Sequence, residues 1–195
     1  MKKIAFVLMA AVALSACSGS VWKAEERRLI MDGDGIMRVL TVDDPADSVI
    51  LRTPSSELGP DAVKSPEYEK LARRMLLTVT DPSQDGVGIA GPQVGVLRRV
   101  VAVQRFDKPG EPFEVYPDIR ILNFRGEPVC GAEGCLSVPG RRGEVLRWRD
   151  IDIAYTSPAT LKDTVETVQG FTAVIFQHEC DHLDGVLYTD KIDLQ

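Results

Sequence analysis

One stretch decides the fold and the chemistry of this chain: Gln177-His178-Glu179-Cys180-Asp181-His182. It contains the pattern H-E-x-x-H, and its two histidines are the only ones among the 195 residues. On a helix, side chains four residues apart lie on one face and can hold one metal ion, and the glutamate beside the first histidine can reach a water on that ion. We therefore predict a helix over 171–183, with His178 and His182 as metal ligands and Glu179 as general acid/base.

A catalytic metal site of this kind needs a third protein ligand and an open position. Common zinc peptidases carry that ligand downstream, but only 13 residues follow His182 in a chain of 195. In the longer pattern H-E-x-x-H-x-x-G-x-x-H, Gly185 matches but the last position is Tyr188. We therefore expect the third ligand upstream, where the stretch Glu133-Gly134-Cys135-Leu136-Ser137 offers the thiol of Cys135.

Three motifs in this order resemble the peptide deformylase family. That family shows G-x-G-x-A-x-x-Q, E-G-C-L-S and Q-H-E-x-D-H, which stand here at residues 86–93, 133–137 and 177–182. The resemblance covers residues 48–193. It implies a hydrolase that removes the N-formyl group from N-formylmethionyl peptides, by attack of a metal-bound hydroxide on the formyl carbon.

The resemblance also implies a role for each matching residue. The metal ligands would be Cys135, His178 and His182. The catalytic groups would be Glu179 as proton carrier, with Gln93 and the backbone amide of Leu136 stabilising the oxyanion. The peptide would be held by Val87, Gly88, Gly134 and Arg142. The family implies one iron(II) ion, with zinc as the alternative, because two imidazoles and a thiolate suit both metals.

The chain departs from the family pattern at two places within the motifs and strands. Gly91 stands where a second alanine is common, and Tyr116-Pro117 stands near where the family often has Asn-Pro. The alternatives to a deformylase are an exported metallo-amidase or metallopeptidase with another substrate, and a non-enzymatic metal-binding lipoprotein. The non-enzymatic lipoprotein is disfavoured because a purely structural metal site needs neither Glu179 nor Gln93.

The remaining sequence predicts an α+β fold, with short, mostly antiparallel strands packed around the C-terminal helix. Ser65-Pro66 begins a helix as N-cap and first-turn proline, and Asp81-Pro82 ends it. The glycine-rich residues 86–95 are interpreted as a loop between this helix and a strand at 100–103. A phosphate loop is excluded by that order, because it must open a helix. Further strands are expected at 119–124, 145–155 and 164–168.

The N-terminus has the pattern of an export signal. Lys2 and Lys3 precede an apolar run at residues 4–14 that is too short to span a bilayer, and Leu14-Ser15-Ala16-Cys17 resembles the lipobox of bacterial lipoproteins. We expect a signal peptide at 1–16 with cleavage before Cys17, a loosely ordered tether and N-terminal arm at 17–47, and a catalytic domain at 48–195. The expected location is the cell envelope. The alternative is a cytoplasmic protein whose translation starts at Met31 or Met37.

Composition limits the partners. The chain has 29 acidic and 23 basic residues and a net charge of -6, which disfavours nucleic acid and anionic membranes. Membrane contact is expected only through a lipid on Cys17. The chain ends at Gln195 without the basic helix that some family members use on the ribosome, so we expect no ribosome association, and we expect a monomer.

Cys130 and Cys180 are interpreted as ordinary core or surface thiols, with a disulfide between them as the alternative.

Overall fold

The computed structural model describes residues 21–192, so the predicted signal peptide 1–16 and Cys17 lie outside the described residues. The helices are α1 (Ala24–Met31), α2 (Pro45–Leu51), α3 (Pro60–Val63), α4 (Pro66–Val79) and α5 (Gly170–Leu183). The strands are β1 (Gly88–Ala90), β2 (Val100–Gln104), β3 (Phe113–Pro117), β4 (Arg120–Arg125), β5 (Val129–Cys135), β6 (Val138–Arg147), β7 (Asp150–Thr156) and β8 (Asp163–Gln169). No helix between residues 21 and 192 has the length and apolar character needed to cross a membrane.

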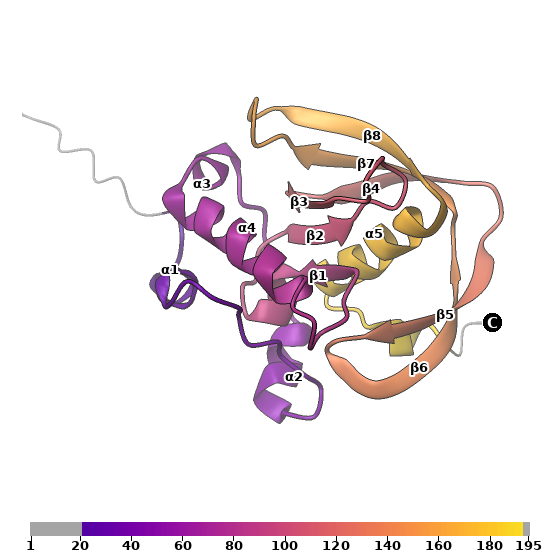
Figure 1. Cartoon of the computed structure of the whole chain (residues 1–195), viewed down its shortest axis with the longest axis horizontal. Helices are drawn as coiled ribbons and strands as arrows, with labels where there is room; N and C mark the ends of the chain where they lie inside the picture. The colour runs from indigo at the N-terminus through magenta and orange to yellow at the C-terminus, as the bar shows by residue number, and fades with distance from the viewer. Residues whose placement is uncertain (1–20, 193–195) are drawn as a thin grey trace, which may run out of the picture.

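The strands form three antiparallel sheets, in the orders β1-β2-β3, β4-β7-β8 and β5-β6. In Figure 1, α5 lies in the middle of these sheets, with β4, β7 and β8 above it and the hairpin β5-β6 below it. The helices α1 to α4 gather on the left of the same view. This mixed α/β fold with antiparallel sheets confirms the predicted fold class at that level.

Two apolar cores hold the elements together. The first lies between α4 and β1-β2, and Leu71, Met75 and Ile89 are fully buried in it. The second surrounds α5 and includes the fully buried Ile151 and Phe176. Because α5 contributes to the second core on several faces, it is apolar nearly all round, as a central helix must be. Apart from Thr172, its polar residues lie in the stretch 177–182 that carries the histidines.

Local sequence explains both long helices. Ser65 caps α4, since its Oγ accepts a hydrogen bond from the Tyr68 amide at 3.2 Å, and Pro66 occupies the first turn. Gly170 has φ +68° and turns the chain from β8 directly into α5. Cys180 on α5 is a free, buried thiol, so the alternative of a disulfide to Cys130 is wrong.

Two stretches differ from the sequence-based expectation. The strand predicted at 145–155 is interrupted after Arg147, because the Gln177 side chain accepts from the Trp148 amide at 3.1 Å and donates to the Trp148 carbonyl at 2.7 Å. A side chain thus takes the bonds that a neighbouring strand would use. The glycine-rich stretch 86–95 is only partly loop, because Gly88–Ala90 pairs with β2 and Gly91–Val94 forms a 3-10 helix.

The expectation of a loosely ordered arm is wrong for residues 21–47. Trp22 and Ile30 are 3% and 0% exposed in the first core, α1 packs against α4, and α2 runs across the predicted boundary between residues 47 and 48. Glu26 lies between these two apolar residues at helical spacing and is itself buried in an ion pair with Arg98. The buried Glu26 interrupts the apolar periodicity of this stretch, so the sequence pattern does not predict the helix α1.

We predict that Ile30→Ala lowers the free energy of unfolding by about 2–5 kcal/mol, because it leaves a cavity in the first core. Urea unfolding followed by circular dichroism measures the change. Met31→Ala, on the same helix but 42% exposed, is the matched control and should change stability by less than about 0.5 kcal/mol. Equal stability of the two variants would contradict the packing described for α1.

Candidate active site

Three side chains from two elements converge beside α5. His178 and His182 lie one turn apart on α5, and Cys135 stands at the end of β5. The Cys135 Sγ is 3.1 Å from the His182 Nε2. One donor atom from each of the three residues lies within 4.8 Å of the other two. The structure therefore brings together the three residues that the sequence predicts as ligands.

A bulge in the hairpin β5-β6 aims the thiol at α5. Gly134 pairs with Arg142, but the next residue, Cys135, pairs with Val138, so the register shifts between them. Bulges of this kind redirect a side chain and end regular pairing. The Ser137 amide donates to the Cys135 Sγ at 3.4 Å, which holds the sulfur in place from the other side of the turn.

A chain of buried charges supports His178. Its Nδ1 lies 2.8 Å from Glu133 Oε2, which leaves Nε2 for the site. Arg147 donates Nε to Glu133 at 2.7 Å and Nη1 to Asp181 at 2.6 Å. Burial alone would raise the pKa of Glu133, but the contacts with His178 and Arg147 lower that pKa to about 2. Glu133 is therefore an anion behind a metal-ligand candidate, an arrangement that fixes the ring and raises its basicity.

Glu133, Arg147 and Asp181 are not among the site residues predicted from the sequence. Glu133 belongs to the motif E-G-C-L-S, but the motif alone assigns it no function. The available signal was Arg147, a charged residue inside the stretch 145–155 that was predicted to be a strand. Such a residue needs a buried partner, but the sequence does not say which acid supplies it.

Glu179 is buried beside β1. Its side chain is 3% exposed, and its Oε2 has no hydrogen-bond partner within residues 21–192. Burial raises the pKa of this carboxyl to about 7, so it can accept and release a proton near neutral pH. A Cβ on Gly88 would lie 2.5 Å from Glu179 Oε1 and 2.8 Å from Ile175 Cγ2. Only glycine lets β1 pass this close to the carboxyl.

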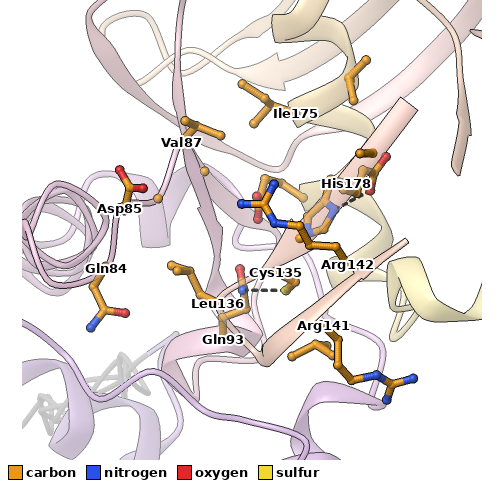
Figure 2. A pocket seen from close by; sticks show the side chains of 18 of the residues that line it. Gln84, Asp85, Val87, Gln93, Cys135, Leu136, Arg141, Arg142, Ile175 and His178 are labelled. Carbon is orange, nitrogen blue, oxygen red and sulfur yellow. Dashed lines mark hydrogen bonds and ion pairs between the residues drawn. The ribbon is translucent and has the colours of Figure 1, made fainter. Parts of the chain in front are cut away.

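Gln93 presents a fixed amide to the same space. Its Oε1 accepts from the Ala90 amide at 2.8 Å, and its Nε2 donates to Ser137 Oγ at 3.2 Å. The same Nε2 is 3.6 Å from Cys135 Sγ (Figure 2). Because Gln93 is 1% exposed and bonded at both ends of its amide, its N–H groups are oriented before any ligand arrives.

These groups open into a cavity of about 810 Å³. Its lining includes nine of the ten predicted site residues: Val87, Gly88, Gln93, Gly134, Cys135, Leu136, Arg142, His178 and Glu179. The tenth, His182, is 1% exposed and lies outside the lining. Arg142 reaches into the middle of the view in Figure 2, whereas Arg141 turns outward.

The sequence interpretation missed several residues of the lining, among them Gln84, Asp85, Arg141, Phe171, Val174 and Ile175. Val174 and Ile175 precede His178 by about one turn of α5, so the helix periodicity was an available signal for them. The polar residues Gln84 and Asp85 precede β1, and nothing in their spacing distinguishes them from a surface turn.

The donor set suits a divalent transition metal. Burial lowers the pKa of His182 well below its ordinary value, so this ring is neutral, as a ligand must be. Burial also disfavours a charged His178, but its contacts with Cys135 and Glu133 outweigh this and raise its pKa to about 10. The surroundings of His178 therefore favour positive charge at this point, and a cation would supply that charge in place of a proton.

Fold and site together define a class: small hydrolases of mixed α/β fold in which an H-E-x-x-H helix lies opposite a cysteine on a β-hairpin. The family model described as polypeptide deformylase matches residues 36–195. A peptide deformylase of Leptospira biflexa is 37% identical over 166 residues, which cover 80% of this chain and 88% of that relative. A peptide deformylase of Finegoldia magna is 39% identical over 136 residues, covering 66% of this chain and 81% of that relative.

Solved structures agree with this class. The class I type b peptide deformylase of Acinetobacter baumannii with bound Met-Ala-Ser has a TM-score of 0.72 and 32% identity, covering 82% of this chain and all of that one. The peptide deformylase of Thermotoga maritima has a TM-score of 0.69 and 30% identity, covering 81% of this chain and 98% of that one.

The chain therefore belongs to the polypeptide deformylase family. It is a metal-dependent hydrolase that removes the N-formyl group from N-formylmethionyl peptides. The alternatives of a metallopeptidase and of a non-enzymatic lipoprotein gain no support from these relatives. Residues 21–35, which include all of α1, precede the stretch that matches the family model.

We predict that Gly88→Ala lowers kcat/KM by about 100-fold, because the new methyl group displaces the Glu179 carboxyl from the reacting atoms. Formate release and metal content per chain are measured together. Gly131→Ala on β5 is the control, since its Cβ would meet nothing closer than Arg149 Nη2 at 3.5 Å. An unchanged kcat/KM in Gly88→Ala would contradict the requirement for glycine beside the Glu179 carboxyl.

Proposed function

We propose that Cys135, His178 and His182 hold one iron(II) ion and that Glu179 carries the proton in deformylation. The observation that carries this proposal is the convergence of two imidazoles and a thiol beside a buried carboxyl whose Oε2 has no hydrogen-bond partner within residues 21–192. Zinc is the alternative ion, because this donor set suits both metals. When bound, the ion would supply Lewis acidity and make a water nucleophilic near neutral pH.

The protein groups then act on the proton and on the developing charge. Glu179 accepts a proton from the attacking water and delivers it to the leaving amine as the formyl C–N bond breaks. Gln93 Nε2 and the backbone amide of Leu136 donate to the formyl oxygen as it becomes negative. Since Ala90 and Ser137 already hold the plane of the Gln93 amide, only the N–H that contacts Cys135 Sγ has to change its acceptor during the reaction.

The cavity is proposed to hold the peptide beyond the formyl group. A solved relative carries Met-Ala-Ser, and the lining here mixes glycine-rich backbone with two cations, Arg141 and Arg142. The backbone at Val87, Gly88 and Gly134 would hold the peptide main chain, and Arg142 would contact it from the rim. Formyl is the smallest acyl group, so the close approach of β1 to Glu179 discriminates against larger amides.

We predict that Glu179→Ala retains the metal but loses formate release from formyl-Met-Ala-Ser by about 10²–10⁴-fold, the usual contribution of a general acid/base. The protein is purified without oxygen and loaded with iron(II), and metal content is determined for each variant. Glu127→Ala, an exposed glutamate between β4 and β5, is the control. The mechanism is wrong if the Glu179 variant keeps the wild-type rate or if metal-loaded wild type releases no formate.

We also propose that the chain is exported and anchored by a lipid on Cys17. The lipobox pattern supports this, and so does the packing of α1. Translation from Met31 or Met37 would remove Trp22 and Ile30, which are 3% and 0% exposed in the first core. A chain that starts at either methionine therefore lacks the side chains that α1 and Trp22 contribute to the first core.

We predict that the protein, expressed from its first codon in a bacterial host, is recovered from membranes with an acylated cysteine as its first residue. Mass spectrometry of the N-terminal peptide identifies that residue. Cys17→Ser should leave the signal peptide uncleaved and remove the lipid. An unmodified N-terminus at Met31 or Met37 would instead establish the cytoplasmic alternative.

A further inference from the structure

Residues 21–35, which precede the family match, contact the loop that follows the 3-10 helix Gly91–Val94, here called the Gln93 helix. We call Trp22, Glu26 and Leu29 the clamp, and residues 95–98 the clamped loop. Glu26 accepts from Arg98 Nε and from Arg98 Nη2, each at 2.9 Å. The Arg98 guanidinium also lies 5.5 Å from the centre of the Trp22 ring. The clamp therefore holds a charged residue of the loop by an ion pair and by an aromatic face.

The pair between Glu26 and Arg98 is buried, since the two residues are 7% and 9% exposed. Two further N–H groups of Arg98 donate to backbone carbonyls, from Nη2 to Val21 at 3.0 Å and from Nη1 to Glu57 at 3.1 Å. Removal of one member of such a pair leaves an uncompensated buried charge. The loop position is therefore strongly coupled to the presence of Glu26.

The clamped loop packs against Gly91, the first residue of the Gln93 helix. A Cβ on Gly91 would lie 2.6 Å from the Val96 carbonyl oxygen and 2.7 Å from that of Arg98. These carbonyls occupy the space that the methyl group of an alanine would take, and alanine is common here in the family pattern. Gly91 is thus the residue that permits the loop to lie where the clamp holds it.

Two further contacts reach the same helix, one from α1 and one from Leu40, which lies inside the family match. A Cβ on Gly95 would lie 3.0 Å from Leu29 Cδ2, so α1 packs directly over the turn that ends the helix. The Leu40 amide donates to the Gln93 carbonyl at 2.8 Å. The helix that carries Gln93 therefore has N-terminal residues on its outer side and the metal-ligand candidates on its inner side.

We propose that the clamp and Gly91 form one positioning device, in which α1 holds the clamped loop against Gly91 and so fixes the Gln93 amide at the oxyanion. The inference rests on the role proposed for Gln93 in deformylation. Glu26, Arg98 and Gly91 are positioning residues that act through Gln93. They do not line the cavity and contact no substrate.

A double-mutant cycle with Glu26→Ala and Gly91→Ala tests the device. Gly91→Ala alone should lower kcat for formyl-Met-Ala-Ser by about 10-fold with KM little changed, because oxyanion contacts act mainly in the transition state. In the Glu26→Ala background the loop is free to move, so the same change should cost at least about 3-fold less. Glu25→Ala, the exposed neighbour of Glu26 on α1, is the control and should show no coupling to Gly91→Ala.

A second readout needs no substrate. The side-chain amide resonance of Gln93 in an isotope-labelled sample should shift in Glu26→Ala and stay in place in Glu25→Ala. If Glu26→Ala does not fold, Leu29→Ala replaces it in the cycle, because it loosens the contact at Gly95 without leaving a buried charge. Rates are compared per folded, metal-loaded chain, so a loss of stability alone does not count as coupling.

Additive effects in an active enzyme, or an unmoved Gln93 resonance, would overturn the positioning device. Absence of formate release from metal-loaded wild type would instead defeat the proposed mechanism. In that case the Gln93 resonance still decides whether α1 positions the amide. The two failures are therefore distinguishable.

Discussion

The bond between His178 and Glu133 is the interaction on which the rest of the active site depends. It joins α5, which carries both histidines, to β5, which carries the cysteine two residues further on. Arg147 on β6 extends the link to Asp181 on the next turn of α5. Because these charges are buried and paired on both sides, the distance between helix and hairpin is set by ionic contacts, which tolerate little displacement.

Close backbone packing at two glycines positions the remaining groups of the active site. Gly88 lets β1 approach the Glu179 carboxyl, and Gly91 lets the 95–98 loop approach the Gln93 helix. In each case the missing side chain makes room for the placement of a neighbouring polar group. The site is therefore assembled by two different means: buried ion pairs orient the ligand candidates, and glycines admit the groups that handle the proton and the oxyanion.

Sequence alone predicted the parts of this arrangement that local spacing controls. The histidines four apart predicted their helix, and Ser65-Pro66 predicted the start of α4, because capping and helical periodicity act within a few residues. The break at Trp148 was missed because its cause is a side chain 29 residues away. The helix α1 was missed because its partner Arg98 lies 72 residues from Glu26, and no local pattern records such a pairing.

The buried pair of Glu26 and Arg98 also determines how this enzyme responds to proteolysis near residue 21. A cut before Trp22 would leave the ion pair and the first core in place. A cut between Glu26 and residue 36 would leave the Arg98 cation without its carboxylate, an uncompensated buried charge that costs about 3–5 kcal/mol. Cleavages fewer than fifteen residues apart thus have opposite results: one preserves this ion pair, and the other leaves a buried cation unpaired.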